Sequence, residues 1–298
     1  MNVSAIIVVK YSPPHFQEML DSIEEFVSEI IIGDVQMDEK LKKELEQNPK
    51  VKIISLPPTI PYADLVKEDL KKESRGEYIL YMDPDEVLPK ETILLLEEKK
   101  DTYDYVLFPR KNFIFGKWIA HSKWWPDYQL RFFKRDAVTW PKTIHPIAEK
   151  NGREFRIEPK EKYAIVHYNY ENLDEFMEKM PRYAKGDAKE RLEQNEEYTL
   201  HKAIKEGISE FIGRFFSSEG YKDGMHGLVL SFLQMFYYLL VYFYTWELKK
   251  YPEMSSKEMA NIASDYFKQG FYETTFWKDK SKLGSSSDKI KMKIIKRL

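Results

Sequence analysis

Tyr78-Ile79-Leu80-Tyr81-Met82, followed at once by Asp83-Pro84-Asp85-Glu86, is the stretch of sequence that decides the fold. The apolar run is short and strand-forming, so it predicts a buried β-strand. Three carboxylates follow where the strand leaves the core, and in an open α/β sheet ligands bind beyond the carboxyl ends of strands. Clustered carboxylates favour a hard divalent cation, Mg²⁺ or Mn²⁺, which in turn recruits phosphate. The alternative is a turn with solvated acids, because Asp-Pro is a good turn starter.

Apolar runs and helical periods alternate on the N-terminal side of this strand. The repeating unit is about 25–30 residues long, which is typical of a parallel, doubly wound sheet. The sequence therefore predicts an α/β fold with a Rossmann-like, mostly parallel sheet and flanking helices. Strands are expected at residues 3–9, 29–34 and 51–56, and helices at 15–27, 40–47 and 63–74.

The chain changes character near residue 170, where helical patterns begin to dominate. We therefore expect a sheet-containing domain over 1–170, a helical C-terminal region over 171–277 and a basic tail over 278–298. Within the first domain, a helix is expected at 89–99, strands at 105–108, 129–134 and 164–168, and a loop or hairpin at 110–125.

Composition limits the function classes. The chain has 298 residues, of which 43% are hydrophobic and 32% charged, as in ordinary folded proteins. A formal net charge of −2 argues against nucleic acid as a partner, because such binding needs a strong positive field. The absence of cysteine excludes disulfides, thiolate nucleophiles and cysteine zinc sites. The N-terminus has no basic signal-peptide region, so a cytoplasmic location is expected.

Asp34 is a second candidate, at the end of the expected strand 29–34. A carboxylate there can hold a ribose hydroxyl or base edge, although it can equally be a turn or cap residue. The chain has neither a Gly-x-Gly-x-x-Gly motif after its first strand nor a Gly-x-x-x-x-Gly-Lys-Ser/Thr motif. A bound nucleotide would therefore need a metal to compensate its phosphate charge.

A third element is Trp124-Trp125-Pro126-Asp127-Tyr128-Gln129-Leu130-Arg131-Phe132-Phe133. Trp124 and Trp125 can form an apolar wall for a sugar ring, and desolvation by such a wall raises the pKa of an acid, which suits Asp127 as a general base. Gln129 and Arg131 lie two apart, hence on one face of a strand. Arg131 suits phosphate because its guanidinium is a bidentate donor. The alternative is an aromatic core edge with a surface salt bridge.

These elements, taken in order, resemble family 2 glycosyltransferases, and more narrowly the branch that includes lipopolysaccharide-core β-glucosyltransferases. The resemblance covers roughly residues 3–250, and the segment 110–133 is its specific part. The motifs are Asp-x-Asp-Glu after an apolar strand, Arg110-x-Asn112-x-x-x-Gly116-x-Trp118-Ile119, Trp-Trp-Pro-Asp-x-Gln-x-Arg-x-Phe, Ile144-His145 and Val166-His167-Tyr168.

The resemblance implies a GT-A fold, a nucleotide-sugar donor (a UDP-sugar first), a divalent metal and inversion at the anomeric carbon. By matching position, Asp34 and Asp83 would contact the nucleoside, and Asp85 would ligate the metal. Asp127 would be the catalytic base, with Gln129 and Arg131 near the diphosphate or acceptor.

The two histidines at matching positions, His145 and His167, have less defined roles, and His167 could approach the metal or the phosphates. The implied acceptor is a glycan or lipid-linked hydroxyl in cell-envelope synthesis, such as that of lipopolysaccharide.

The chain departs from the family in two loops. The segments 10–14 and 35–38 lack the usual Thr/Asn-rich and Ser/Gly-containing turns, which affects the expected nucleotide base. Two other functions stay open: a sugar-phosphate nucleotidyltransferase, which would want a glycine-rich basic loop after the first strand, and a non-catalytic nucleotide- or sugar-binding module. The persistence of Asp83, Asp85 and Asp127 weighs against the module.

Residues 227–246 contain no Asp, Glu, Lys or Arg. The run is just long enough to span a bilayer, but its many tyrosines favour a helix at the membrane surface or against the catalytic domain, rather than a span. The tail 278–298 carries eight Lys/Arg against two Asp/Glu. It is expected either to attract an anionic membrane or to be a disordered solubilising tail. A peripheral position at the inner face of the cell membrane follows as an expectation.

Overall fold

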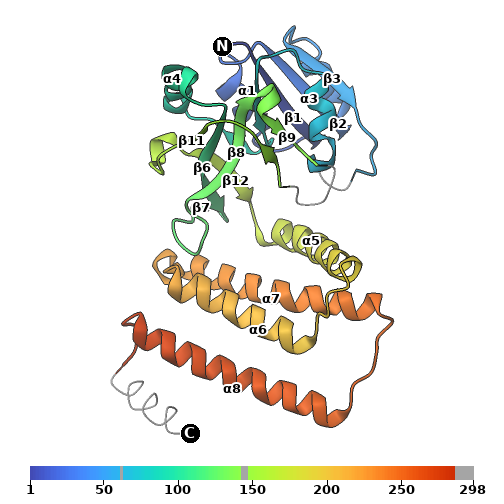
Figure 1. The fold of residues 1–298 in the computed structure, drawn as a ribbon, viewed down its shortest axis with the longest axis vertical. Coiled ribbons are helices and arrows are strands. Elements are labelled where there is room, and N and C mark those ends of the chain that lie inside the picture. The colour runs from blue at the N-terminus through green and yellow to red at the C-terminus, as the bar shows by residue number, and fades with distance from the viewer. Residues whose placement is uncertain (61–62, 142–146, 286–298) are drawn as a thin grey trace. The chain divides into compact units, whose positions relative to one another are not determined.

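The computed structural model describes residues 1–60, 63–141 and 147–285 and divides into two compact units. One, here the sheet unit, comprises Met1–Phe113 and Trp125–Asn169. The other, here the helical unit, comprises Ile114–Trp124 and Tyr170–Leu298. Figure 1 shows the strands in the first unit and the long helices in the second. His145 and the tail beyond residue 285 lie outside the described residues.

The sheet unit is built on one mixed sheet with the strand order β3-β2-β1-β4-β8-β6-β12-β5. Its first half is parallel, since β1 pairs in parallel with both β2 and β4, and β2 with β3. From β4 to β8 and from β8 to β6 the pairing is antiparallel. The strands on this path are β1 (Val3–Tyr11), β2 (Glu29–Met37), β3 (Val51–Ser55), β4 (Tyr78–Met82), β5 (Glu86–Val87), β6 (Tyr105–Ile114), β8 (Asp127–Lys134) and β12 (Ile165–Tyr170).

Helices cover both faces of this sheet, which is why its central strands are apolar on both sides. On one face Ile7 of β1 packs in a cluster with Met19 of α1 (Phe16–Ile23) and Leu96 of α4 (Lys90–Lys99). On the other, Ile6 packs with Leu70 of α3 (Lys67–Lys72). A further helix, α2 (Glu39–Leu45), follows β2. The predicted α/β class, with a parallel-dominated sheet and a helical C-terminal part, is confirmed.

Two local expectations were wrong. The second strand does not end at Asp34, because β2 continues to Met37. The segment expected as a loop or hairpin over 110–125 begins as a hairpin: β6 runs to Ile114, and after a turn at Gly116 with φ of 73° the short β7 (Lys117–Trp118) pairs with it. The helix expected over 63–74 begins as a 3-10 turn, Ala63–Val66, before α3.

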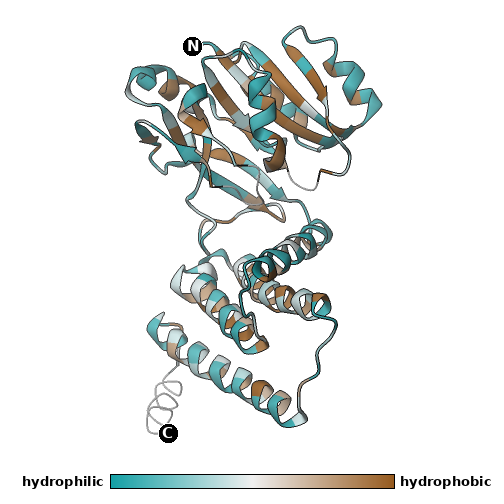
Figure 2. Ribbon diagram, turned by 45° about the vertical axis from the view of Figure 1, so that its right-hand side comes forward, coloured by the Kyte–Doolittle hydropathy of each residue, from teal (hydrophilic) through white to brown (hydrophobic). Residues whose placement is uncertain are grey.

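The helical unit contains α5 (Leu173–Glu193), α6 (Leu200–Ile212), α7 (Met225–Leu248) and α8 (Ser256–Lys280). Side-chain caps start three of them, at Asn172, Thr199 and Ser255. The insertion 114–124 is anchored in this unit by Asp223, whose carboxylate accepts hydrogen bonds from the backbone N–H groups of Ala120 and His121. Figure 2 shows the apolar residues concentrated in the strands and in α7.

Within the described residues, α7 alone is long and apolar enough to cross a membrane, judged by length and composition. The core helix of a soluble protein passes the same test when it is mostly buried. In α7, however, only 22% of the most apolar 18-residue window is buried.

Candidate active site

The three carboxylates after β4 leave the strand in different directions. Every residue of β4 is buried, and the chain then turns at Pro84 and Asp85 into β5. The turn is closed by the N–H of Glu86, which donates to the Asp83 carbonyl at 3.1 Å. β5 pairs with β12 so that Glu86 lies opposite His167. Asp83 and Glu86 share Arg131, whereas Asp85 lies 3.7 Å from Nε2 of His167, so the three acids do not converge on one cation.

Asp83 and Glu86 are bound by Arg131 of β8. Nη2 of Arg131 donates to both, at 2.6 Å from Oε1 of Glu86. Glu86 is fully buried and Arg131 is 4% exposed, so this ion pair lies inside the protein. The backbone N–H of Asp83 also donates to Oε2 of Glu86, at 3.2 Å. Arg131 is therefore already neutralised, unlike the free phosphate-binding arginine that the sequence suggested.

Arg110 joins this pair to Asp127. The two residues lie opposite each other on β6 and β8. Nε and Nη2 of Arg110 donate to Oδ2 of Asp127 at 2.8 and 2.6 Å, and Nη1 donates to Oε1 of Glu86 at 3.1 Å. Gln129 donates to the other oxygen of Asp127 at 2.8 Å. Two arginines and three acids thus form one connected network.

Asn112 links Asp127 to His167. Its amide nitrogen donates to Oδ2 of Asp127 at 3.1 Å, which turns its oxygen toward Nδ1 of His167 at 2.6 Å. Nδ1 must then carry the proton, so in a neutral imidazole Nε2 has the lone pair. Nε2 lies 3.7 Å from Oδ1 of Asp85. A ligand nitrogen and a ligand oxygen are thus side by side, and the Asn112 oxygen orients the imidazole as a carboxylate or backbone carbonyl does behind a metal-binding histidine.

The electrostatics correct one expectation about Asp127. Burial alone raises the pKa of this carboxyl, as the sequence suggested, but Arg110 and the hydrogen bonds from Asn112 and Gln129 lower its pKa below the usual value. Burial likewise acts to raise the pKa of Asp83, and Arg131, with Lys67, outweighs it and holds that pKa well below its usual range. Both acids are therefore ionised at neutral pH, and Asp127 is a weak base.

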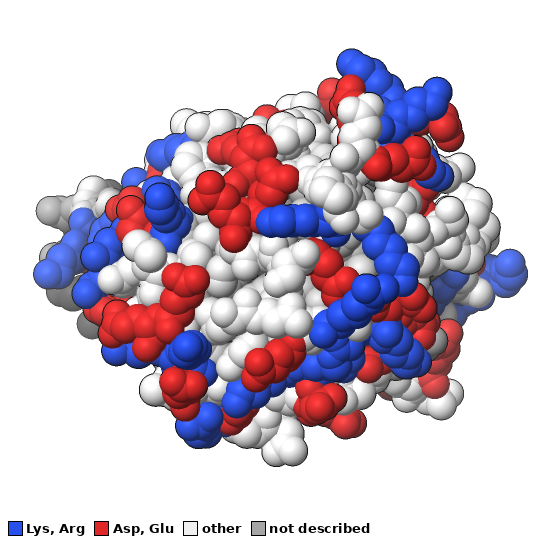
Figure 3. Space-filling view, turned by 90° about the horizontal axis from the view of Figure 1, so that it is seen from above, with Lys and Arg blue, Asp and Glu red and all other residues white. Residues whose placement is uncertain are grey.

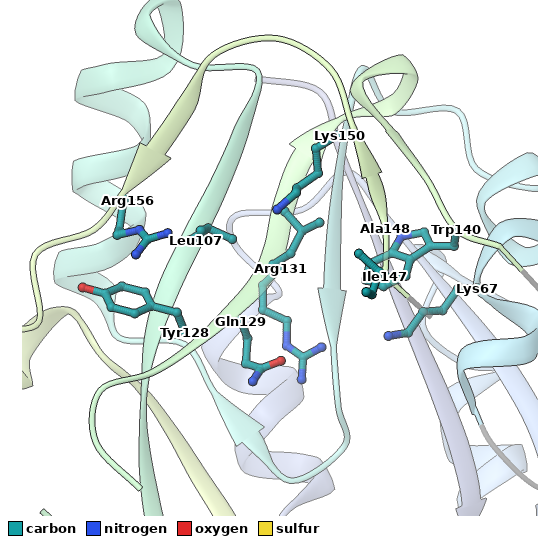
Figure 4. Close-up of a pocket in the computed structure, with 11 residues that line it drawn as sticks. Lys67, Leu107, Tyr128, Gln129, Arg131, Trp140, Ile147, Ala148, Lys150 and Arg156 are labelled. Carbon is teal, nitrogen blue, oxygen red and sulfur yellow. The ribbon is translucent and has the colours of Figure 1, made fainter. Parts of the chain in front are cut away.

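A cavity of about 480 Å³ lies beside this network and is lined in part by two of its members, Gln129 and Arg131. In Figure 4, Gln129 and Arg131 project into it from β8 and Lys67 reaches in from the opposite wall. The Lys67 ammonium lies 4.3 Å from the ring centre of Trp140. Within the described part of the chain, Nε of Arg131 and Nε1 of Trp140 are buried donors with no hydrogen-bond partner. The lining residues are Lys67, Leu107, Tyr128, Gln129, Leu130, Arg131, Trp140, Ile147, Ala148, Lys150 and Arg156.

Asp34 has two partners of its own. Its Oδ1 accepts from the N–H of Met37 at 2.7 Å and its Oδ2 from Nζ of Lys42 at 3.0 Å. The side chain is largely buried. This arrangement is that of a turn-stabilising aspartate, which was the alternative to a nucleoside contact.

The two tryptophans before Asp127 belong to different units. Trp124 packs in the helical unit with Phe176 and Leu230, and the Arg214 guanidinium lies 5.1 Å from its ring centre. Trp125 lies in the sheet unit and forms a cis peptide bond with Pro126. Neither lines the 480 Å³ cavity described above.

Several residues of this site received no role from the sequence. Glu86, Arg110 and Asn112 stand in the quoted motifs, and Lys67 and Trp140 lie outside them. Arg110 and Asn112 are two apart in a strand, hence on one face, and this spacing is the signal that points to them. For Lys67 and Trp140 the sequence offers no such signal, because they come together only when α3 and the segment after β8 pack against each other.

A divalent cation fits this donor set only in part. No group of three or more His, Asp or Glu side chains in the described ranges has metal-binding geometry. Asp83 and Glu86 are committed to Arg131, which leaves Asp85 and His167 as the pair that could hold an ion. Mg²⁺ sites are often completed by substrate phosphates, and a nitrogen ligand makes Mn²⁺ the better expectation of the two.

The charged residues on one face of the molecule are of both signs. On the face in Figure 3, lysines and arginines alternate with aspartates and glutamates around an uncharged centre.

No protein-family model matches the chain, and no curated protein does. Solved structures similar to it include residues 1–349 of TarS from S. aureus, which is a GT-A-type glycosyltransferase. The two sequences are 17% identical, the match covers 73% of this chain and 72% of that one, and the TM-score is 0.43. The same protein in complex with UDP has 12% identity, covers 82% and 91%, and has a TM-score of 0.41.

The bifunctional IspDF of Campylobacter jejuni has 10% identity, 59% and 54% coverage and a TM-score of 0.38. Scores at this level leave function to be argued from this chain's own residues.

Proposed function

We propose that this chain is a metal-dependent, inverting glycosyltransferase of the family 2 type. It would move a hexose from a nucleotide sugar, a UDP-sugar first, to a hydroxyl of a glycan or lipid-linked acceptor in cell-envelope synthesis, such as that of lipopolysaccharide. Its proposed location is the inner face of the cell membrane. The observation that carries the proposal is the connected network at the end of β4, in which Asn112 orients His167 toward Asp85.

The donor diphosphate would lie in the cavity beside Arg131. Lys67 supplies a cation there, and the buried N–H groups of Arg131 and Trp140 supply donors that lack partners within the described residues. A buried donor without a partner is costly, so a bound oxygen at this place would stabilise it. Asp85 and His167 would hold the divalent cation, which when bound would neutralise charge on the leaving diphosphate.

The acceptor hydroxyl would lie at Asp127, on the exposed side of its carboxylate. Three donors hold this carboxylate in place, so it can orient the hydroxyl before reaction. Its lowered pKa makes it accept the proton late, as the bond to the anomeric carbon forms. A single carboxylate suffices, because the diphosphate leaves without the general acid that glycosidases need.

The test is thermal stabilisation of the full chain by a panel of nucleoside diphosphates and nucleotide sugars, with Mn²⁺ and with a chelator. A ligand that binds only the native state increases the free energy of unfolding, by about 2.7 kcal/mol at a hundredfold excess over Kd, and therefore raises Tm. We expect a Mn²⁺-dependent rise with a uridine nucleotide that is lost in Asp85→Ala. Asp136→Ala, which removes an exposed acid on a 3-10 turn of the same unit, is the matched control and should behave as wild type.

The outcomes separate the alternatives. Transfer by the wild type that falls about 10²–10⁴-fold in Asp127→Asn, with the Tm shift kept, supports the transferase. Preference for a nucleoside triphosphate and a sugar phosphate would indicate a nucleotidyltransferase instead. A Tm shift without turnover on any acceptor would indicate a binding module, and a shift indifferent to chelator would refute the assigned cation site.

A further inference from the structure

Helix α8 is barely packed. Thr275 alone of its residues is buried, and Phe267 and Phe271 are 73% and 54% exposed. Such large exposed aromatics in one stripe are unusual for a soluble helix and mark an interaction surface. The two phenylalanines are four apart, so they lie on one face of the helix.

Helix α7 exposes a stripe of the same kind. Met225, Phe232, Phe236, Phe243 and Trp246 are all exposed, and spacings of seven, four, seven and three place them on one face. No charged residue occurs between 227 and 246. This face is therefore apolar over most of the helix length, while the opposite face packs on α5 and α6.

An apolar cavity of about 360 Å³ lies where α6, α7 and α8 meet. It shares Phe232, Phe267 and Phe271 with the exposed stripes, so the cavity and the stripes form one continuous apolar surface. Its lining contains no charged residue, and the hydroxyl of Thr274 is used within α8, donating to the Gly270 carbonyl at 2.6 Å. The lining residues are Ile208, Phe211, Phe232, Met235, Tyr266, Phe267, Gly270, Phe271 and Thr274.

Two glycines of this region differ in an informative way. A Cβ on Gly207 of α6 would lie 2.9 Å from the Met235 carbonyl oxygen, so close helix packing requires that glycine. A Cβ on Gly270 of α8 would meet only Ile208, at 4.0 Å. Glycine within a helix is less stable than alanine because it loses more backbone freedom on folding. Neither packing nor a left-handed backbone requires Gly270, and its effect is to widen the cavity.

The lining also indicates what kind of ligand fits. Protein interfaces carry about one hydrogen bond per 100–200 Å², whereas this cavity offers a partner almost no donor or acceptor. Cations stand at the ends of the stripes, with Lys249 and Lys250 after α7 and Lys278 and Lys280 at the end of α8. Aromatic residues beside lysines are typical of the membrane–water boundary, and the lysines complement anionic headgroups.

We propose that this cavity, here the chain groove, holds one hydrocarbon chain of a membrane lipid while the exposed stripe of α7 lies against an anionic bilayer. The proposal goes beyond the glycosyl transfer argued above and does not depend on it. Lipid capture through α7 and α8 would concentrate the protein at a membrane whatever reaction the sheet unit performs.

The test compares lipid binding by wild type with binding by a variant whose side chain fills the groove. The full chain is floated with phosphatidylcholine vesicles containing about 30% phosphatidylglycerol, and titrated separately with the fluorescent single-chain probe cis-parinaric acid. We expect wild type to float and to bind the probe saturably. Gly270→Leu places a side chain in the groove and should weaken both by about tenfold or more, since each methylene of the lipid chain that it displaces loses its burial. Gly270→Ala is the matched control and should bind nearly as wild type.

Several results would overturn the proposal. One is that wild type neither floats with the vesicles nor binds the probe. Another is that Gly270→Leu and Gly270→Ala bind the probe equally well. A third is that wild type is a dimer that does not bind vesicles and that Phe243→Ser dissociates. The last would make the stripe an interface between copies of this chain. Thr274→Ile, which narrows the groove from the same helix, repeats the test if Gly270→Leu fails to fold.

Discussion

The sheet unit and the helical unit depart from ordinary burial in opposite directions. The sheet unit places charge in its interior: Glu86 is fully buried and Arg131 nearly so, next to strands that are otherwise apolar. The helical unit leaves large apolar side chains in solvent, among them Phe267, Met225 and Phe271. Both departures cost stability, and each lies at the place where we locate a ligand. Buried charge marks the proposed polar site, and exposed aromatic surface marks the proposed lipid site.

The largest expected effect comes from breaking the buried charge. Arg131→Met leaves Asp83 and Glu86 without their guanidinium, and removal of one partner of a buried ion pair destabilises by about 3–5 kcal/mol. Arg156→Met is the matched control, because Arg156 lines the same cavity but is exposed and pairs with Glu154. That change should cost less than about 1 kcal/mol.

Urea unfolding of both variants measures the difference. Equal, small losses would mean that the sheet unit does not depend on its interior charge, and the contrast between the two units would disappear.

A smaller effect concerns pH. The folded-state pKa of Asp83 lies below its unfolded value of about 3.9, so the stability it contributes is present above that value and is lost as pH falls toward the folded pKa. Asp83→Asn should therefore be less stable than wild type at pH 7 by about 1 kcal/mol, after allowance for its partial exposure. The gap should begin to narrow below about pH 4, where the unfolded carboxyl takes up its proton while the folded carboxyl stays ionised.

Unfolding free energies of both proteins from pH 7 to pH 3 test this expectation, with Asp136→Asn as the exposed control. A gap that stays constant with pH would show that packing, rather than charge, distinguishes the two side chains.

Most of the fold could be predicted because its signals are local. The apolar run of β4 and the alternation of strands with helices depend on residues close in sequence, and they place the sheet class and the helical C-terminal part correctly. The boundaries that were missed depend on tertiary pairing. β6 continues past residue 108 because Pro109 and Arg110 pair with Tyr128 and Asp127 of β8, and its end at Ile114 lies beside β7 and β12, which no local pattern encodes.

The members of the candidate site were predicted in part, since Asp34 stabilises a turn and neither Trp124 nor Trp125 lines the 480 Å³ cavity, and their interaction partners were not predicted. Asp83, Asp127, Gln129, Arg131 and His167 were each selected from sequence, and the structure brings them into one network with Glu86, Arg110 and Asn112. Which acid pairs with which arginine is decided by the tertiary structure. Arg131 therefore binds acids rather than lying open to phosphate, and the pKa of Asp127 is lowered by Arg110 rather than raised by its aromatic neighbours.

The smallest expected effect concerns Gly270 of the helical unit, and it tests whether the chain groove or the packing of α8 requires a glycine there. If the groove is kept open at a cost to stability, Gly270→Ala should stabilise the chain by about 0.5–1 kcal/mol, since alanine is the better helix former. Ala260→Gly, in an exposed part of the same helix, is the reverse change and should destabilise by a similar amount. Thermal unfolding of the two variants measures both. Stabilisation by alanine with lipid binding kept, and loss of binding with leucine, would mean that the size of residue 270 is set by the groove rather than by the helix. A destabilising Gly270→Ala would instead reveal a packing need at that position, and the groove would be a by-product of how α8 meets α6.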